Sequence, residues 1–341
     1  MSKQPGGPTA AQPERPQATD PTAAEEQALP ADDSAGSPPS APGTLVLALL
    51  AAGWLAAMLW STREAISSAT AGVTAISLSA FALPGVISAA LVAGAAVGLA
   101  AGEPVTRRGD RATLRFAVAV GAGLLVGLAA ALAISLSYAD NTTTRTIAGT
   151  TAAAAVIGGA LAGARNGAVV GAVASAALGT LVFVVGFSVA RAPLFDLFGA
   201  GDSQQSVITA ATWVSRTESL LAGLLAGFLA FGYLTWARRR AARRDTPVTA
   251  LRWPVYLIAG AGPGLLLLVA EVIIRVGGRS LIDLAAALSE ADAVAQTSMG
   301  TSRVDNGIWV LFVGALTAMI VFGRTLSPTP ETDPAEADAV R

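Results

Sequence analysis

The segment from Ile147 to Ala190 restricts the possible folds of this chain more than any other, because Arg165 is its only charged residue. A polar turn, Arg165-Asn166-Gly167, joins two apolar runs, each close to the roughly 20 residues with which a helix crosses about 30 Å of hydrocarbon. Small residues at every fourth position let membrane helices approach closely. We therefore predict a tightly packed transmembrane helical hairpin here, with the other apolar helices around it. The small residues are Gly159, Gly163, Gly167, Gly171, Ser175 and Gly179.

The scarcity of charge extends over the whole chain. Charged residues make up 13% of it and apolar residues 53%, whereas a soluble domain carries about 25% charge. The sequence therefore predicts an all-α integral membrane protein, a polytopic bundle of about eight transmembrane helices over residues 44–323 with Gly-xxx-Gly-type packing. The predicted spans are residues 44–60, 81–102, 116–136, 147–164, 168–190, 215–236, 253–276 and 307–322.

The two ends of the chain have a different composition. Residues 1–43 are rich in Pro, Ala and polar residues, and residues 324–341 are rich in Pro and acidic residues. Neither segment can bury enough apolar surface to offset its chain entropy, so we predict disordered tails. The first apolar run begins near Thr44, which argues against a cleaved signal peptide at the N-terminus.

The distribution of arginine predicts the orientation. With eight spans, the arginine clusters fall in alternate loops, and positive charge is typical of cytoplasmic loops. We therefore expect a multi-pass protein of the cell membrane with both termini cytoplasmic. Lys3 is the only lysine, and the bias toward Arg, Ala, Gly and Val favours a bacterial source. The cytoplasmic loops hold Arg107 to Arg115, Arg165, and Arg238 to Arg252; the opposite loops hold Arg63, Arg145, Arg191, Arg216, Arg279 and Arg303.

Two segments outside the spans show helical periodicity. Residues 61–80 place Ile66, Ala69, Val73, Ile76 and Ala80 on one face and a stripe of hydroxyl groups on another, which predicts an interfacial helix, with a re-entrant segment as the alternative. An extra span there would put arginine clusters on the wrong side. The loop 277–306 contains a second amphipathic pattern, formed by Leu281, Leu284, Leu288 and Ala291.

Glu271 and Arg275 are the most suggestive ionisable pair. They are four residues apart and so lie on one helix face, and an ionisable residue at membrane depth is a candidate for function. The pair fits either an interfacial structural ion pair or a solute path. Pro263, within Gly260 to Gly264, removes a backbone donor and predicts a kink. Such a kink serves packing, or it is an interrupted helix of the kind at which transporters bind solutes.

Glu218 is a second acidic residue next to an apolar run. Residues Arg191 to Val214 read as a polar loop, and Ser215-Arg216-Thr217-Glu218 follows the S-x-x-E pattern. This pattern is typical of a capping box at a helix start. We therefore predict that Glu218 caps the helix over residues 215–236.

Several function classes are excluded by composition. The chain has no Cys and no His, which removes disulfides, imidazole catalysis and the common zinc sites. No catalytic constellation or nucleotide-binding motif is visible, so we expect no enzyme activity, no cofactor and no metal. The arginines from Arg238 to Arg244 follow a transmembrane end, which favours contact with acidic headgroups over nucleic acid.

The remaining glycines recur at four-residue spacing on several spans. They favour packing within the chain, with a homo-oligomer or membrane-partner face as the alternative. Two functions follow as hypotheses: a permease- or channel-like protein for a small solute, or a non-catalytic scaffold or subunit of a membrane complex. The expected packing glycines are Gly94, Gly98, Gly102, Gly159, Gly163, Gly167, Gly171, Gly179, Gly223 and Gly227.

Overall fold

The computed structural model describes residues 41–68, 72–108, 112–138, 142–164, 166–201, 203–243 and 251–325. Within these ranges the chain is helical without strands, and eight helices are long and apolar enough to cross a membrane. The predicted all-α membrane bundle is confirmed. The eight are α1 (Thr44–Ser67), α2 (Gly72–Arg108), α3 (Ala112–Ser137), α4 (Thr142–Ala164), α5 (Gly167–Val189), α7 (Gln204–Ala242), α8 (Trp253–Gly277) and α10 (Glu290–Gly323); α6 (Arg191–Leu197) and α9 (Arg279–Leu288) are short.

Three helices are much longer than the predicted spans. With 37, 39 and 34 residues, α2, α7 and α10 extend about 50 to 60 Å at 1.5 Å per residue, against about 30 Å of hydrocarbon. Ser203 starts α7 and Ser289 starts α10, because each serine side chain accepts a hydrogen bond from a backbone N–H three residues later. The expected polar loop over residues 191–214 is therefore wrong, and helix occupies most of it.

The segment 61–80 does not form one interfacial helix. α1 continues to Ser67 and α2 begins at Gly72, so the segment lengthens two spans and that prediction is wrong. Part of the predicted apolar face, Ala69, lies outside the described residues. The second amphipathic pattern is also divided, because α9 ends at Leu288 and the extended Ser289 separates it from α10.

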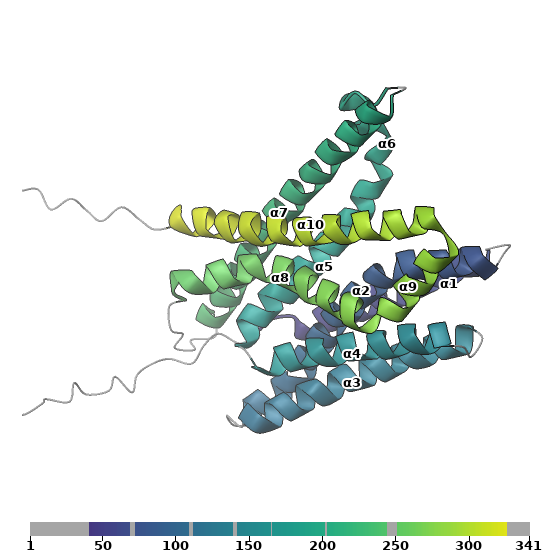
Figure 1. Cartoon of the computed structure of the whole chain (residues 1–341). Coiled ribbons are helices and arrows are strands. Elements are labelled where there is room, and N and C mark those ends of the chain that lie inside the picture. The colour runs from purple at the N-terminus through teal and green to yellow at the C-terminus, as the bar shows by residue number, and fades with distance from the viewer. Residues whose placement is uncertain are drawn as a thin grey trace, which may run out of the picture. The chain divides into compact units, whose positions relative to one another are not determined.

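Helices α4 and α5 do not form the tight hairpin predicted for Ile147 to Ala190. Asn166 caps α5 by accepting a hydrogen bond from the Ala168 N–H at 3.0 Å, and beyond this turn the two helices share few contacts. α4 packs along α3 and α2, whereas α5 packs against α7 and α8. Figure 1 shows α3 and α4 side by side, with α7 crossing α10 obliquely.

The chain is fixed to the bundle just before α1. Ala41 is buried in a cluster with Leu99 and Val170, and the Tyr233 hydroxyl donates to the Pro42 carbonyl at 2.8 Å. Residues 41–43 are therefore packed, although they belong to the expected N-terminal tail. Residues 1–40 and 326–341, on which most of the two tail predictions fall, lie outside the described residues.

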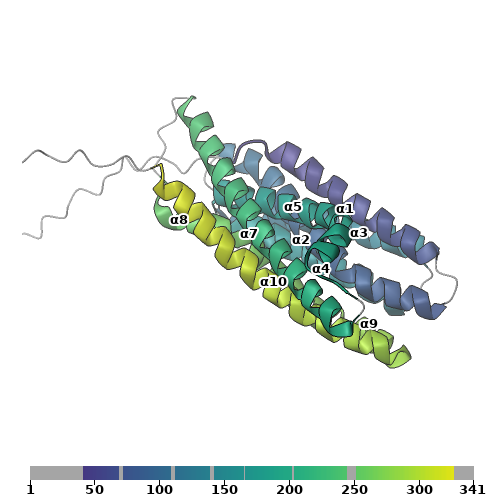
Figure 2. The same ribbon diagram turned by 90° about the horizontal axis from the view of Figure 1, so that it is seen from above.

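Successive long helices run in opposite directions, which gives the bundle two ends (Figures 1 and 2). One, here called the basic end, holds the C-terminal arginines of α7 and the start of α8. It contains an aromatic cluster, in which buried Tyr256 stacks on Phe322 with ring centroids 4.5 Å apart and accepts a hydrogen bond from Arg238. The other, the α6–α9 end, holds the two short helices.

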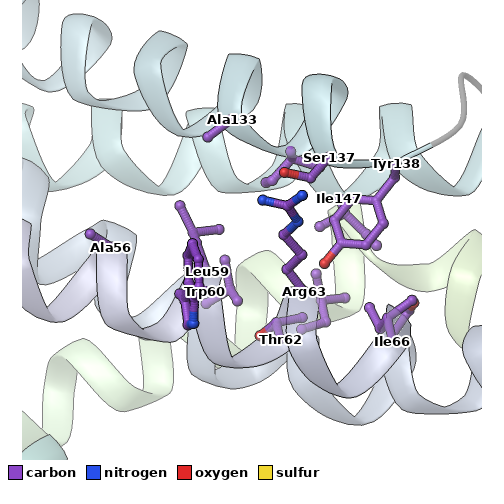
Figure 3. A pocket seen from close by; sticks show the side chains of 14 residues that line it. Ala56, Leu59, Trp60, Thr62, Arg63, Ile66, Ala133, Ser137, Tyr138 and Ile147 are labelled. Atoms are coloured by element: carbon purple, nitrogen blue, oxygen red, sulfur yellow. The ribbon is translucent and has the colours of Figure 1, made fainter. Parts of the chain in front are cut away.

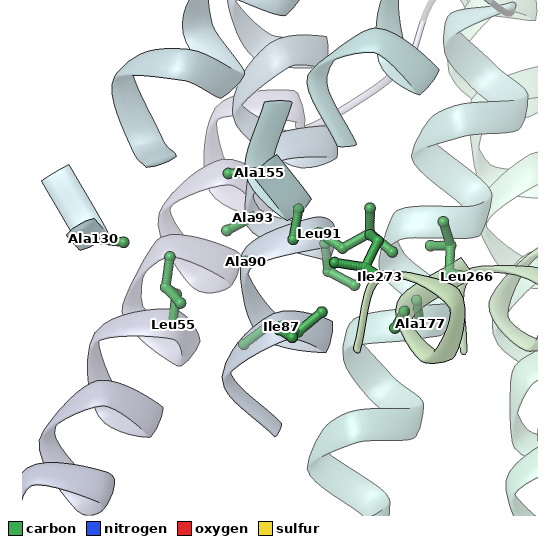
Figure 4. Close-up of a cluster of buried hydrophobic side chains, with 14 of the residues drawn as sticks. Leu55, Ile87, Ala90, Leu91, Ala93, Ala130, Ala155, Ala177, Leu266 and Ile273 are labelled. Carbon is green, nitrogen blue, oxygen red and sulfur yellow. The ribbon is translucent and has the colours of Figure 1, made fainter. Parts of the chain in front are cut away.

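The apolar core surrounds the middle of α2. Figure 4 shows Ile87 and Leu91 of α2 beside Leu266 and Ile273 of α8, and all are buried. α1 and α3 leave leucines exposed on their outer faces, among them Leu125, as helices facing lipid do. Towards the α6–α9 end, α1, α2, α3 and α4 enclose a pocket lined by Arg63 and Tyr138 (Figure 3).

Candidate functional site

Glu271 lies at the centre of a buried ion cluster. Its side chain is 5% exposed, and the Arg275 Nε is 2.9 Å from its Oε1. On the other side, the Nε of Arg303, from α10, is 2.8 Å from its Oε2. Burying a carboxylate is costly unless it is paired and hydrogen-bonded, and here each oxygen accepts from a different guanidinium. The Glu271–Arg275 contact follows from their spacing, whereas sequence reasoning did not link Arg303 to the pair.

The ion cluster has an excess positive charge. One carboxylate faces two guanidinium groups, and their surroundings differ: the Arg303 side chain is 25% exposed and that of Arg275 is 59% exposed. Gly300 on α10 lies beside the carboxylate, since a Cβ there would be 3.7 Å from the Glu271 Oε1. A small residue at this position leaves room for the carboxylate between α8 and α10. Of the two arginines that pair with Glu271, Arg303 is the less exposed to solvent.

Glu218 is a second buried carboxylate, and its predicted role as a helix cap is wrong. It lies well inside α7, which begins at Gln204, and its side chain is 7% exposed. It accepts a hydrogen bond from the Arg191 Nη2 at 3.0 Å. Ser219, the next residue, donates to the Asn306 side chain at 2.5 Å. The S-x-x-E pattern matched within a continuous helix, and no local signal related Glu218 to an arginine 27 positions away.

A cavity of about 160 Å³ contains both buried carboxylates. It adjoins a wider pocket of about 540 Å³ between α7 and α10, because Ser219 and Asn306 line both. The wider pocket is lined largely by polar side chains near the α6–α9 end. The polar residues of the inner cavity are Ser88, Thr180, Glu218, Ser219, Glu271, Arg303 and Asn306; those of the wider pocket are Thr212, Ser215, Arg216, Ser219, Ser298, Ser302, Asp305 and Asn306.

The cavity ends against an apolar floor. Below it, only about 10 Å³ remains between Leu91, Leu181, Leu266 and Pro263, which is at the limit of what one water needs. Further on lies the aromatic cluster at the basic end. Within the described residues, the polar route thus runs from the α6–α9 end to the ion cluster, and the space that follows it is small and apolar.

Pro263 lies in this floor, and α8 is continuous through it from Trp253 to Gly277. The neighbouring glycines make close contacts. A Cβ at Gly260 would be 2.4 Å from the Gly314 carbonyl oxygen, and one at Gly264 would be 2.3 Å from the Leu311 nitrogen. The segment Gly260 to Gly264 thus brings α8 against α10, and of the three residues singled out for a polar path, Glu271 and Pro263 line adjoining cavities.

Most of the expected packing glycines face another helix of the same chain. The contacts are of two kinds, to backbone and to side chains, and Gly102 and Gly167 have looser ones, above 3.2 Å for an added Cβ. The tight contacts run between α2 and α4 at Gly94, between α3 and α4 at Gly159 and Gly163, among α2, α3 and α4 at Gly98, between α5 and α7 at Gly171 and Gly179, and between α7 and α10 at Gly223 and Gly227.

No group of three or more Asp or Glu side chains that could hold a metal occurs among the residues that the structure describes. The fold and the site together define a polytopic α-helical membrane protein with a polar cavity that reaches a buried ion cluster. Comparison with protein-family models, curated proteins and solved structures finds no match to this chain.

Proposed function

We propose that this protein is a permease- or channel-like membrane protein that passes a small polar solute through the bundle, with Glu271 and Arg303 at the binding position. The proposal rests mainly on the cavity that connects the α6–α9 end to this buried ion cluster. Ionisable groups inside a membrane bundle are costly, and they often mark solute or ion paths. A complete path through the bundle would also require the apolar floor at Pro263 to open.

The position of the arginines gives the proposal a direction. If the basic end faces the cytoplasm, as the positive-inside bias favours, the cavity opens to the cell exterior and the apolar floor lies on the cytoplasmic side. Such an arrangement would correspond to an outward-open state of a carrier. Transport would require α8 or α10 to move at the floor near Pro263.

Thiol labelling tests whether the cavity is wet, and the chain is suited to it because it has no Cys. Ser302→Cys in the wider pocket and Asn306→Cys, at a position that lines both the wider pocket and the inner cavity, should react with a charged, membrane-impermeant methanethiosulfonate added to intact cells. Leu266→Cys in the floor is the matched control and should stay unmodified. Equal labelling of Leu266→Cys, or none of Ser302→Cys, contradicts the proposed access route.

Flux through proteoliposomes tests the function itself. Chloride, acetate, potassium and glycine represent an inorganic anion, an organic anion, a cation and a zwitterion. At least one should cross faster with the protein present, and Glu271→Gln should abolish that flux because the ion cluster loses its only carboxylate. A flux unchanged by Glu271→Gln removes the residue from the path.

The second candidate is a non-catalytic scaffold or subunit of a membrane complex. It is supported by glycines that the bundle does not use: Gly53, Gly121 and Gly232 have open space where a Cβ would be. They would let a partner helix, or a second copy, approach closely. Purification in mild detergent should then recover a stoichiometric partner or a homo-oligomer, and a lone monomer counts against this role.

A further inference from the structure

The pocket between α1, α2, α3 and α4 is separate from the ion cavity and shares no lining residue with it. Its volume is about 240 Å³, which is below the roughly 300–1,000 Å³ of sites for whole drug-sized ligands. Most of its wall is apolar, and its polar lining residues include Thr62, Arg63, Ser79, Ser137 and Tyr138. The apolar wall includes Leu59, Leu83, Val86, Ala133, Ile134 and Ile147.

Arg63 and Tyr138 form the polar side of this pocket. Figure 3 shows the Arg63 guanidinium extending towards Ser137 and Tyr138. Arg63 lies over the Trp60 ring at 5.9 Å, and among the described residues no carboxylate pairs with it. The Tyr138 hydroxyl oxygen is buried and has no hydrogen-bond partner among the residues that the structure describes. A buried hydroxyl without a partner is costly, so the pocket is incomplete as it stands.

Both groups would donate hydrogen bonds to a ligand. Burial raises the pKa of the Tyr138 phenol, and the positive charge of Arg63 opposes this rise, so the phenol stays protonated at neutral pH. A guanidinium and a phenol together fit an anionic oxygen group such as a phosphate. Trp60 is 67% exposed beside Arg63, and tryptophan prefers the depth of lipid headgroups.

We propose that this pocket binds one anionic phospholipid from the leaflet at the α6–α9 end. The phosphate lies at Arg63 and Tyr138, and one acyl chain lies along the apolar wall. The apolar wall decides between a lipid and a free anion, because a soluble anion would leave that wall unfilled. The positive charge decides between anionic and zwitterionic lipids, since no carboxylate of the described chain neutralises Arg63.

Lipid retention on the whole purified protein tests the proposal. Phosphatidylglycerol, phosphatidylcholine and inorganic phosphate are added in turn to detergent-solubilised protein, and binding is read by native mass spectrometry and by thermal shift. Phosphatidylglycerol should bind most tightly. Arg63→Gln should weaken its binding about tenfold, the effect of losing one charge-assisted hydrogen-bonded pair. Arg240→Gln is the matched control, because Arg240 also lies over a tryptophan, Trp236, at 5.8 Å, but lines neither this pocket nor the cavities of the ion cluster.

Tyr138→Phe gives an independent reading. It removes the buried hydroxyl without changing the ring, so the lipid-free protein should unfold at the same temperature or higher while its affinity for phosphatidylglycerol falls. The proposal is overturned by equal binding to wild type and Arg63→Gln, by equal binding of phosphatidylcholine, or by stabilisation with inorganic phosphate alone. A Tyr138→Phe variant that loses stability but keeps lipid affinity also contradicts it.

Discussion

Two groups of three helices use glycine in different ways. In α2, α3 and α4, tight contacts continue along the helices: an added Cβ at Gly94 would be 2.0 Å from the Ala155 oxygen, one at Gly127 2.8 Å from the Ala152 oxygen, and one at Gly163 2.8 Å from the Phe116 Cα. The Thr150 hydroxyl in α4 donates to the Thr146 carbonyl of its own helix.

Between α7, α8 and α10, the tight glycine contacts lie nearer the basic end, whereas Gly277 of α8 contacts Thr150 of α4 at the opposite end. In each of these helices the glycines that make these contacts lie on the basic-end side of the ion-pairing residue, whereas Gly300 of α10 lies on the other side of Arg303, beside the Glu271 carboxylate. α7 has Gly223 and Gly227 against Glu218, α8 has Gly260 and Gly264 against Glu271, and α10 has Gly307 and Gly314 against Arg303. Backbone contact leaves no space for solvent, so polar groups and cavities begin where the glycines stop. The first group is therefore the rigid support, and the second holds the ion cavity.

The largest expected effect comes from a single methyl group in the rigid group. Gly158→Ala places a Cβ 2.0 Å from the Leu91 oxygen of α2, and a backbone atom cannot rotate away. We expect a loss of about 3 kcal/mol, at the upper end of ordinary overpacking, measured by thermal unfolding in detergent. Gly149→Ala on the same helix is the control, because nothing lies within 4 Å of its Cβ. Similar losses for both variants would contradict the role of close approach, since helix propensity alone favours Ala over Gly.

The same change in the second group should cost less. Gly264→Ala brings a Cβ to 2.3 Å from the Leu311 nitrogen, but α10 borders the ion cavity at Val310 and Asn306 and has space to shift. We expect about 1–2 kcal/mol, since overpacking costs less where the surroundings can move. Gly232→Ala on α7, with no atom near its Cβ, serves as control. A loss as large as that of Gly158→Ala would mean that the two groups are equally rigid.

Glu271→Gln tests how much the ion cluster stabilises the second group, α7, α8 and α10. It keeps the shape of the side chain and leaves two guanidinium groups without their carboxylate. We expect a loss of about 1–2 kcal/mol, below the 3–5 kcal/mol of a fully buried pair, because both arginines are partly exposed. Asp283→Asn is the control, since its pair with Arg279 is exposed on both sides and should change stability by less than about 0.5 kcal/mol. Equal effects would place Glu271 in ordinary solvent contact.

The sequence alone was sufficient for the class and the number of spans, because charge-free runs of about 20 residues have no other stable environment than lipid. It was insufficient for the partners of each helix. Glycine spacing shows that a helix is approached closely, but not by which neighbour, and so α4 and α5 were paired wrongly. Helix ends were also missed, since the start of α7 depends on Ser203 and not on the loss of apolar residues.

The candidate site, too, could be predicted from the sequence only in part. Glu271 and Arg275 could be paired from the sequence, because contacts four positions apart follow from helix geometry. Arg303 and Arg191 reach their carboxylates from other helices, 32 and 27 positions away. Such contacts depend on how helices cross, which the sequence pattern does not contain. The part of the ion cluster that lies between helices, and with it the cavity, therefore required the structure.

The smallest expected effect distinguishes the two arginines of Glu271. Double-mutant cycles with Glu271→Gln should give a coupling of about 1 kcal/mol for Arg303→Gln and below about 0.5 kcal/mol for Arg275→Gln, because exposed pairs within one helix contribute little. The exposures of 25% and 59% predict this order. High salt should weaken the Arg275 coupling and leave that of Arg303 nearly unchanged, since buried pairs are screened less. If both couplings fall equally with salt, Arg303 is in contact with bulk solvent. The ion cluster of α7, α8 and α10 would then be a surface feature and not a buried one.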